Sequence, residues 1–410
     1  MTTRARSDPR GLVGPTAGYA AIGLSAFVLL ASGPRLLGPD VYSLLAISWT
    51  VVTIFGFGLA FPAEQTITTI VAGNGSRDQV RTIVRIVALA AAALVVVPVA
   101  AMAGANHLLA DSTLWSVAIL GGALAWTANV KPRGTLSGEG RFHAYGLTQV
   151  GEAVTRILLC SLAWVMPQPA AWLAAALVLP LVTSAVMGHR RSGRPPASGA
   201  ALSQPTSAAA SFGAIVVVAL SFQLILNAAA LIIQWRLPGQ PAGEYVSAMT
   251  YMRIPMLLTG GFMTVVLSSA AVAWASSDSN ALNRALSVAG LGALVCLALT
   301  AAVWLVSSAA LALFYGSTIE FERGTLVLLG VVVVVAVTAN LLTQIGLAAH
   351  RQRAMAVFWA LSAVATVALL LVLPTSELIV TVAILVGLMC CIVPTLWLTL
   401  RLRTELARAA

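Results

Sequence analysis

Charged residues are scarce in this chain. Asp, Glu, Lys and Arg make up 9% of its 410 residues, whereas soluble domains average about 25%. Hydrophobic residues make up 59%. A chain of this length would need far more charge to cover a soluble surface, so the composition excludes an ordinary soluble enzyme. The length excludes a protein with one membrane anchor, because a single crossing takes about 20 residues.

Lysine is almost absent: the 23 basic residues are 22 arginines and Lys131, and the net charge is +10. In a soluble protein this excess would suggest a nucleic-acid partner, but its distribution indicates another cause. With the N-terminus inside, 18 basic residues fall in cytoplasmic segments and three on the opposite side. The asymmetry follows the positive-inside rule, so we expect both termini in the cytoplasm and no nucleic-acid partner.

Catalytic and metal-binding patterns are also missing. The cysteines lie inside apolar runs, no C-x-x-C or Cys/His spacing occurs, and no Walker loop, G-x-S-x-G or H-E-x-x-H motif is present. We therefore expect no metal, no cofactor and no enzymatic activity. The cysteines are Cys160, Cys296, Cys390 and Cys391.

Long apolar runs dominate what remains. Runs of about 18 or more residues are typical of transmembrane helices. The sequence predicts an all-α, multi-pass protein of the cell membrane with twelve such helices. The predicted spans are 12–33, 41–72, 82–104, 113–136, 143–166, 169–188, 208–235, 243–275, 284–315, 325–349, 354–373 and 377–400.

One long polar stretch divides the spans into two groups of six. Residues 189–207 are rich in Arg, Pro and Ser, which is typical of a linker. The sequence therefore predicts an N-terminal lobe over 1–188, a cytoplasmic linker over 189–207 and a C-terminal lobe over 208–410.

The two groups resemble each other. Arg35–Tyr42 and Arg236–Tyr245 both follow the order Arg, Gly, Pro, acid, Tyr, and each leads into a long apolar run. Thr127-Ala-Asn129 recurs as Thr338-Ala-Asn340. Six helices separate the copies, so the halves have the same orientation, as in transporters built from parallel repeats. We expect two parallel six-helix lobes.

Several motifs resemble those of one transporter family. The stretch 35–42 resembles the R-x-L-G-P-x-x-Y-G signature of polysaccharide and lipid-linked-oligosaccharide flippases, with Ser43 in place of the final glycine. The stretch 134–145 is similar to their G-x-x-x-G-x-x-R-F-x-x-Y turn, and Glu244-Tyr245 resembles the second-lobe element. The family belongs to the multidrug/oligosaccharidyl-lipid/polysaccharide exporter superfamily.

This resemblance implies a function. Such a protein moves a polyprenyl-pyrophosphate-linked glycan from the inner to the outer leaflet, by alternating access of its two lobes. Its partners are the lipid-linked glycan, the surrounding membrane lipids and other membrane proteins of glycan assembly; we expect a monomer. The energy source stays open among membrane potential, protons and sodium.

Arg253 is the first candidate for substrate binding. It lies about ten residues into the eighth predicted span, where an unpaired charge is costly and is expected to face a cavity or a partner. Arginine binds phosphate well through its two-pronged donor geometry. A structural ion pair with an unidentified acid is the alternative.

Three further charged residues are candidates. Glu152 and Arg156 stand four residues apart in the favourable order for an ion pair within a helix, so a structural pair competes with a role in substrate binding. Glu64 is predicted to end its span near the cytoplasmic face, either reaching the interface or serving as a protonatable site. Arg133 is expected to extend to lipid headgroups at the end of its span.

Two other functions compete with the flippase. A small-molecule antiporter of the drug type should carry acidic residues deep in its cavity, whereas the deepest unpaired charge predicted here is Arg253. A membrane-embedded glycan polymerase or ligase should carry a large outer loop, whereas the longest predicted outer connection has about ten residues.

Overall fold

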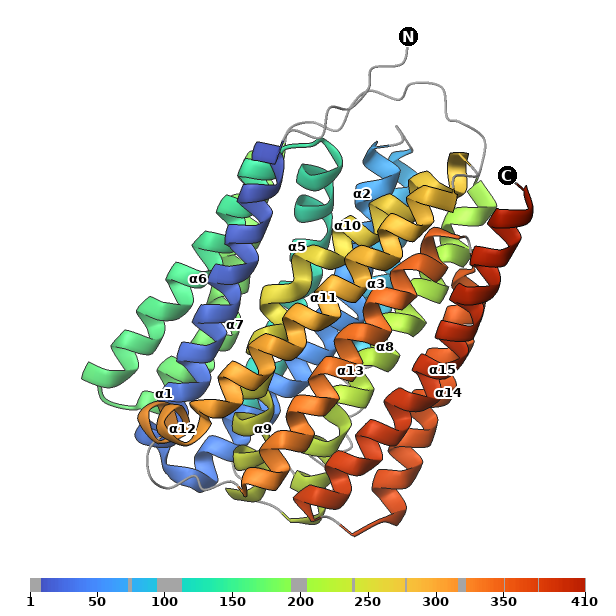
Figure 1. Cartoon of the computed structure of the whole chain (residues 1–410). Helices are drawn as coiled ribbons and strands as arrows, with labels where there is room; N and C mark the ends of the chain where they lie inside the picture. The colour runs from blue at the N-terminus through green and yellow to red at the C-terminus, as the bar shows by residue number, and fades with distance from the viewer. Residues whose placement is uncertain are drawn as a thin grey trace. The chain divides into compact units, whose positions relative to one another are not determined.

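The computed structural model confirms the all-helical class: every regular element in the described residues is a helix (Figure 1). The described residues are 9–72, 76–93, 113–192, 205–237, 240–276, 279–315, 322–349, 351–374 and 376–409. The predicted linker over 189–207 falls mostly outside these ranges.

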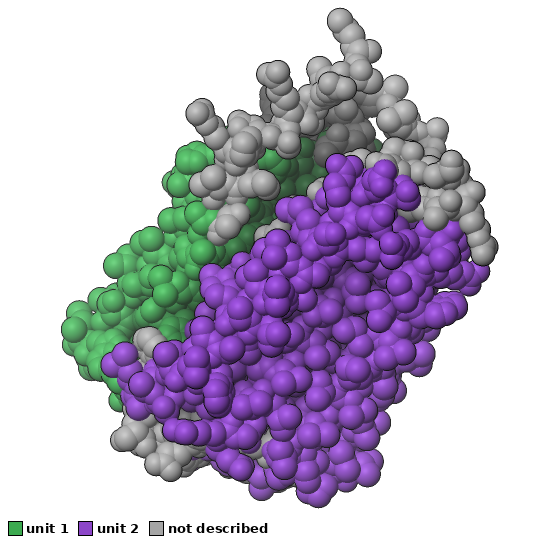
Figure 2. All heavy atoms as spheres, viewed as in Figure 1, with its two compact units in different colours: residues 1–37, 51–212 green, residues 38–50, 213–410 purple. Residues whose placement is uncertain are grey.

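The chain divides into two compact units (Figure 2). Unit 1 comprises residues 1–37 and 51–212. Its helices begin with one long helical stretch that a π-helix interrupts. They are α1 (Pro9–Phe55), the π-helix η1 (Gly56–Ala60), α2 (Phe61–Ala72), α3 (Arg77–Ala91), α5 (Thr113–Gly138), α6 (Phe142–Val165) and α7 (Pro169–Arg191).

Unit 2 comprises residues 38–50, which belong to α1, and residues 213–410. The helices that follow α7 supply most of it. They are α8 (Pro205–Arg236), α9 (Gln240–Met252), α10 (Ile254–Ser276), α11 (Ser279–Leu305), α12 (Ser307–Tyr315), α13 (Arg323–Ala348), α14 (Gln352–Val372) and α15 (Glu377–Ala409).

Within the described ranges, eight helices are long and apolar enough to cross a membrane, so the predicted count of twelve is not confirmed. The first of the eight, Ala17–Val71, has 55 residues, more than twice the length that one crossing needs. Helix α6 is not among them, because Glu152 and Arg156 lower its hydropathy. Large apolar side chains such as Leu124 and Val372 lie exposed on these helices. Helices of this length and surface are those of a multi-pass membrane protein.

Two helix breaks have visible causes. Gly38 interrupts α1 with φ of 73°, a backbone conformation that favours glycine, which explains the glycine of the 35–42 motif. Helices α9 and α10 meet at Arg253, two residues before Pro255. Proline lacks the amide that would continue the helical hydrogen bonding, and its ring clashes with the preceding turn. The second break places Arg253 between two helices.

Candidate functional site

In unit 1, the Glu152 carboxylate binds two arginines from different helices. Arg156 lies one turn further along α6, and its Nη2 donates to Glu152 Oε1 at 2.9 Å. Arg133 comes from α5, and its Nη2 donates to Glu152 Oε2. All three side chains are at most 3% exposed. Both carboxylate oxygens are therefore engaged, and the predicted pair is one part of a triad.

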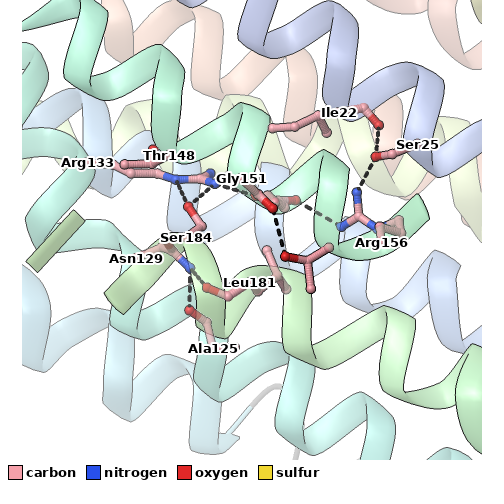
Figure 3. Close-up of polar contacts among 12 residues, drawn as sticks. Ile22, Ser25, Ala125, Asn129, Arg133, Thr148, Gly151, Arg156, Leu181 and Ser184 are labelled. Carbon is pink, nitrogen blue, oxygen red and sulfur yellow. Dashed lines mark hydrogen bonds and ion pairs between the residues drawn. The ribbon is translucent and has the colours of Figure 1, made fainter. Parts of the chain in front are cut away.

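Neutral groups satisfy the remaining guanidinium donors. Arg133 Nε and Nη2 donate to Ser184 Oγ on α7 at 3.1 and 2.7 Å, a contact shown in Figure 3. Arg156 Nη1 donates to Ser25 Oγ on α1 at 2.9 Å, and its Nε reaches the Ala176 carbonyl at 3.4 Å. The triad thus joins α1, α5, α6 and α7. Such extra hydrogen bonds are what make a buried ion pair tolerable.

Glu64 lies beside this triad. Tyr145 on α6 donates its hydroxyl to Glu64 Oε1 at 2.6 Å, and the Tyr19 and Tyr145 hydroxyls lie 2.8 Å apart. Gly134 allows the approach of α2 to α5, because a Cβ there would lie 2.8 Å from the Glu64 carbonyl oxygen. An electrostatic interaction links Glu64 to Arg133. The two glutamates and two arginines form one buried group whose formal charges cancel.

The placement of two of these residues corrects the sequence analysis. Glu64 was expected either to reach the cytoplasmic interface or to serve as a protonatable site, and Arg133 was expected to extend to headgroups. The two residues are 4% and 2% exposed. The expected positions at the interface are wrong, because each side chain meets a neighbouring helix. Glu64 accepts from Tyr145 on α6. Arg133 donates to Glu152 on α6 and Ser184 on α7. The roles of Glu64, Glu152 and Arg156 in substrate binding stay predictions.

Arg253 has different surroundings, in unit 2. Its Nη1 donates to Asn227 Oδ1 at 3.0 Å, and its Nη2 donates to the Leu226 carbonyl at 2.6 Å. Both acceptors lie on α8 and carry no formal charge. No carboxylate of the described residues pairs with Arg253, so the described part of the chain does not contain the ion pair predicted as the alternative. The role of Arg253 in substrate binding stays a prediction.

A small cavity adjoins Arg253 within unit 2. Polar and apolar residues from the segment 38–50 and from α8 and α9 line it, and Thr50, Asn227 and Thr250 are among the polar ones. Arg253 itself lines the cavity, and its Nε finds no hydrogen-bond acceptor among the described residues. The site therefore offers one uncompensated positive charge beside hydroxyl and amide groups, which suits an anionic ligand.

Sequence reasoning missed several residues that build these sites. Arg133 and Tyr145 carried weak signals: a charge after Pro132, and a tyrosine in the 134–145 motif. Ser25 and Ser184 gave no signal, because serine is common in membrane helices. Asn227 was visible as a polar residue within a span, but nothing in the sequence pairs it with Arg253.

Comparison with known proteins gives a clear result at the level of the fold. No family model and no curated protein matches the sequence. Among solved structures, the inward-facing and outward-facing conformations of a multidrug resistance MATE family transporter of the MOP superfamily match with TM-scores of 0.70 and 0.69. Their sequence identities are 17% and 16%. The alignments cover 95% and 100% of this chain, and 96% and 100% of theirs.

The chain has the fold of MOP superfamily transporters. A MOP superfamily transporter from Pyrococcus furiosus matches as well, with a TM-score of 0.66 and 15% identity over 96% of this chain and 95% of that one. These identities establish the fold alone. The resemblance seen in the motifs is thus confirmed for the superfamily fold, whereas the flippase branch within it stays a proposal.

Proposed function

We propose that the protein is a secondary transporter that moves a polyprenyl-pyrophosphate-linked glycan from the inner to the outer leaflet by alternating access. The superfamily fold supports the transport class and argues against an enzyme. The motifs at 35–42 and 134–145 support the flippase branch, because they resemble its signatures. The glycan headgroup needs a polar cavity, and its phosphates need a cation.

The observation that carries the proposal is the partnership of Arg253. A guanidinium in a membrane-spanning region is costly, and such a charge faces a cavity or pairs with an acid or with backbone carbonyls. Arg253 instead has neutral oxygen acceptors and borders a cavity. A pyrophosphate would supply the missing negative charge, and the planar guanidinium can donate to two of its oxygens at once.

The buried acids also favour an anionic substrate over a cationic one. A carrier of cationic drugs needs a carboxylate that is free to meet its substrate. Here both oxygens of Glu152 are bound by arginines, and Glu64 accepts from Tyr145 beside Arg133. These two buried acids are thus engaged by the protein itself, which favours an anionic substrate.

A drug-type exporter of the same fold is the second candidate. It draws support from the similar structures, which are described as multidrug resistance transporters. The Pyrococcus furiosus transporter is described as having a binding pocket of reversed polarity that suggests a different function. The fold therefore accommodates binding pockets of different polarity, and the charge at Arg253 makes the flippase our first choice.

A reconstituted flipping assay tests the proposal. Proteoliposomes would contain a pyrophosphate-linked lipid with a fluorescent sugar, and accessibility to an impermeant quencher would report translocation. Arg253→Ala should slow translocation at least tenfold, because a charge-assisted hydrogen bond contributes about 1.5–3 kcal/mol. Arg253→Lys should retain part of the rate, since it keeps the charge but loses the two-pronged geometry.

Arg236 offers a matched control for this substitution. It belongs to the same unit and also donates to main-chain carbonyls, those of Leu371 and Leu373, but it lies at the end of α8. Arg236→Ala should leave translocation within about twofold of the wild-type rate. Unchanged flipping in Arg253→Ala, or transport of a cationic dye in place of the lipid, would refute the flippase assignment.

A further inference from the structure

Asn227 is the residue that holds Arg253. It lies on α8 and is 5% exposed. Its amide nitrogen donates to the main-chain carbonyl of Gln223 at 2.8 Å and to Gln223 Oε1 at 3.0 Å. These two bonds fix the orientation of the amide, because the nitrogen must face Gln223. The oxygen Oδ1 therefore faces Arg253, at 3.0 Å from Nη1.

The Leu226 carbonyl completes the hold. It accepts from Arg253 Nη2 at 2.6 Å, so consecutive residues of α8 bind the two terminal nitrogens of one guanidinium. A planar group with both ends bound cannot rotate freely, which reduces the entropy lost when a ligand binds. Nε has no acceptor among the described residues, so the guanidinium keeps a donor for a ligand.

The chemistry of the acceptor matters as much as its place. An asparagine oxygen orients a guanidinium without cancelling its charge, whereas an aspartate of nearly the same shape would cancel it. Unit 1 shows the second arrangement, in which Glu152 neutralises Arg133 and Arg156. In unit 2 the side chain that accepts from the arginine is the neutral amide of Asn227. The difference of one atom decides whether Arg253 attracts an anion.

We propose that Asn227 is a positioning residue that holds Arg253 in place while preserving its positive charge, and that it thereby determines the selectivity of this site for pyrophosphate-bearing lipids. The inference rests on the proposed function, because it assigns Asn227 a role at the same site. It predicts that binding of the headgroup needs a hydrogen-bond acceptor at residue 227 that carries no charge of its own.

The decisive variant is Asn227→Asp in the purified full-length protein. Binding of farnesyl pyrophosphate and of uncharged farnesol would be measured side by side in detergent. The variant should bind farnesyl pyrophosphate at least tenfold more weakly and farnesol unchanged. Its Tm should be equal to or above that of the wild type, because the new carboxylate would pair with a half-buried cation whose acceptors among the described residues are neutral. Weaker binding with undiminished stability is a result that a merely structural role would not give.

Asn340→Asp is the matched control. Asn340 on α13 belongs to the same unit and accepts a hydrogen bond at 3.0 Å from Gln344, one turn further along its helix. The substitution introduces the same charge at an amide that has no arginine partner in the described residues. Its affinity for farnesyl pyrophosphate should stay within twofold of the wild type.

The outcomes separate the inference from the proposed function. If Arg253→Ala binds farnesyl pyrophosphate as well as the wild type, the proposed function fails. If Arg253→Ala binds weakly but Asn227→Asp binds normally, the inference alone is overturned. Should Asn227→Asp not fold, Asn227→Leu is the deciding variant, because it removes the hydrogen-bond acceptor and leaves the charge of Arg253 uncompensated. Binding of farnesyl pyrophosphate weakened by threefold or more would support the positioning role. Unchanged binding would reject it.

Discussion

At the scale of single residues, the partner of a charge decides what the charge can do. Glu152 and its two arginines are buried together, and their ion pairs and hydrogen bonds join four helices of unit 1. Arg253 has only neutral acceptors among the described residues, Asn227 and the Leu226 carbonyl, so they leave its charge uncompensated. Removing one member of a buried group leaves the others uncompensated, which costs far more than removing an exposed charge.

Glu152→Gln should therefore destabilise the protein strongly. It would leave two buried guanidinium groups facing a neutral amide, and breaking a buried ion pair costs about 3–5 kcal/mol. Glu405 is a matched control, because it also contacts two arginines, Arg351 and Arg401, but its side chain is 37% exposed. Glu405→Gln should change the free energy of unfolding by about 1 kcal/mol or less. Equilibrium unfolding in detergent would measure both.

The reversal Glu152→Arg with Arg156→Glu supplies the contrary test. If Glu152 and Arg156 formed an isolated pair, the exchange would restore stability. The structure predicts that it will not, because the new arginine would face Arg133. A reversed variant as stable as the wild type would contradict the triad.

Part of this site could be predicted from the sequence. The spacing of Glu152 and Arg156 predicts their ion pair, which is confirmed, because both residues lie on one helix and helical geometry fixes their distance. The contacts of Glu64 with Tyr145 and of Arg133 with Glu152 join different helices. Position along a span indicates depth, but it does not reveal which neighbouring helix a side chain meets.

At the scale of elements, hydropathy located most helices and missed the irregularities within them. The predicted spans 143–166 and 354–373 correspond closely to α6 (Phe142–Val165) and α14 (Gln352–Val372). Apolar runs reveal such helices because hydrophobic length is what a membrane selects. The π-helix η1 has no such signal, since one extra residue in a turn leaves the hydropathy unchanged.

Gly56 opens this π-helix and packs against an aromatic side chain. A Cβ at Gly56 would lie 2.4 Å from the Trp126 ring, which also packs against Phe57 with ring centroids 5.6 Å apart. The contact joins η1 to α5, both within unit 1. A glycine here serves close packing between helices, as small residues do in membrane proteins.

Gly56→Ala should lower the stability of the protein, because the methyl group would displace Trp126 or the helix that carries it. Overpacking of this kind costs about 1–3 kcal/mol. Gly290→Ala is the control: Gly290 lies within α11, and no neighbouring atom lies within 4 Å of its added Cβ. That change should stabilise the helix by up to about 1 kcal/mol. Thermal unfolding followed by fluorescence should therefore give Tm shifts of opposite sign, and equal shifts would contradict the packing argument.

At the scale of the molecule, the division of the chain into two units differs by one segment from the division that the sequence predicts. The polar stretch predicts a division near residue 207, whereas residues 38–50 belong to unit 2 although they lie early in the chain. Specific contacts explain their place: the hydroxyls of Tyr42 and Ser247 lie 2.6 Å apart, and a Cβ at Gly243 would meet the Tyr42 ring at 2.9 Å. Contacts between residues more than 200 positions apart in the chain cannot be predicted from the composition of either segment.

The orientation of the chain in the membrane is still a prediction, and its physical basis is the arginine asymmetry. The four cysteines form no disulfide, so they can be replaced to give a background free of thiols. New cysteines would then be placed at exposed residues beside α6 and α14. His143 and Arg353 are expected on the cytoplasmic side, and Pro167 and Ser376 on the opposite side; all four are exposed.

An impermeant maleimide should label Pro167→Cys and Ser376→Cys in intact cells, and His143→Cys and Arg353→Cys only after permeabilisation. The reason is that His143 and Pro167 lie at opposite ends of α6, and Arg353 and Ser376 lie at opposite ends of α14. The basic residues are expected to keep the ends near His143 and Arg353 in the cytoplasm. If His143→Cys and Arg353→Cys were labelled in intact cells instead, both termini would lie outside, and the proposed direction of transport would be reversed. Labelling of His143→Cys and Pro167→Cys from the same side would contradict the crossing of α6, whose Glu152 and Arg156 kept its hydropathy below that of the other spans. Because these charges are compensated inside unit 1, we expect α6 to cross.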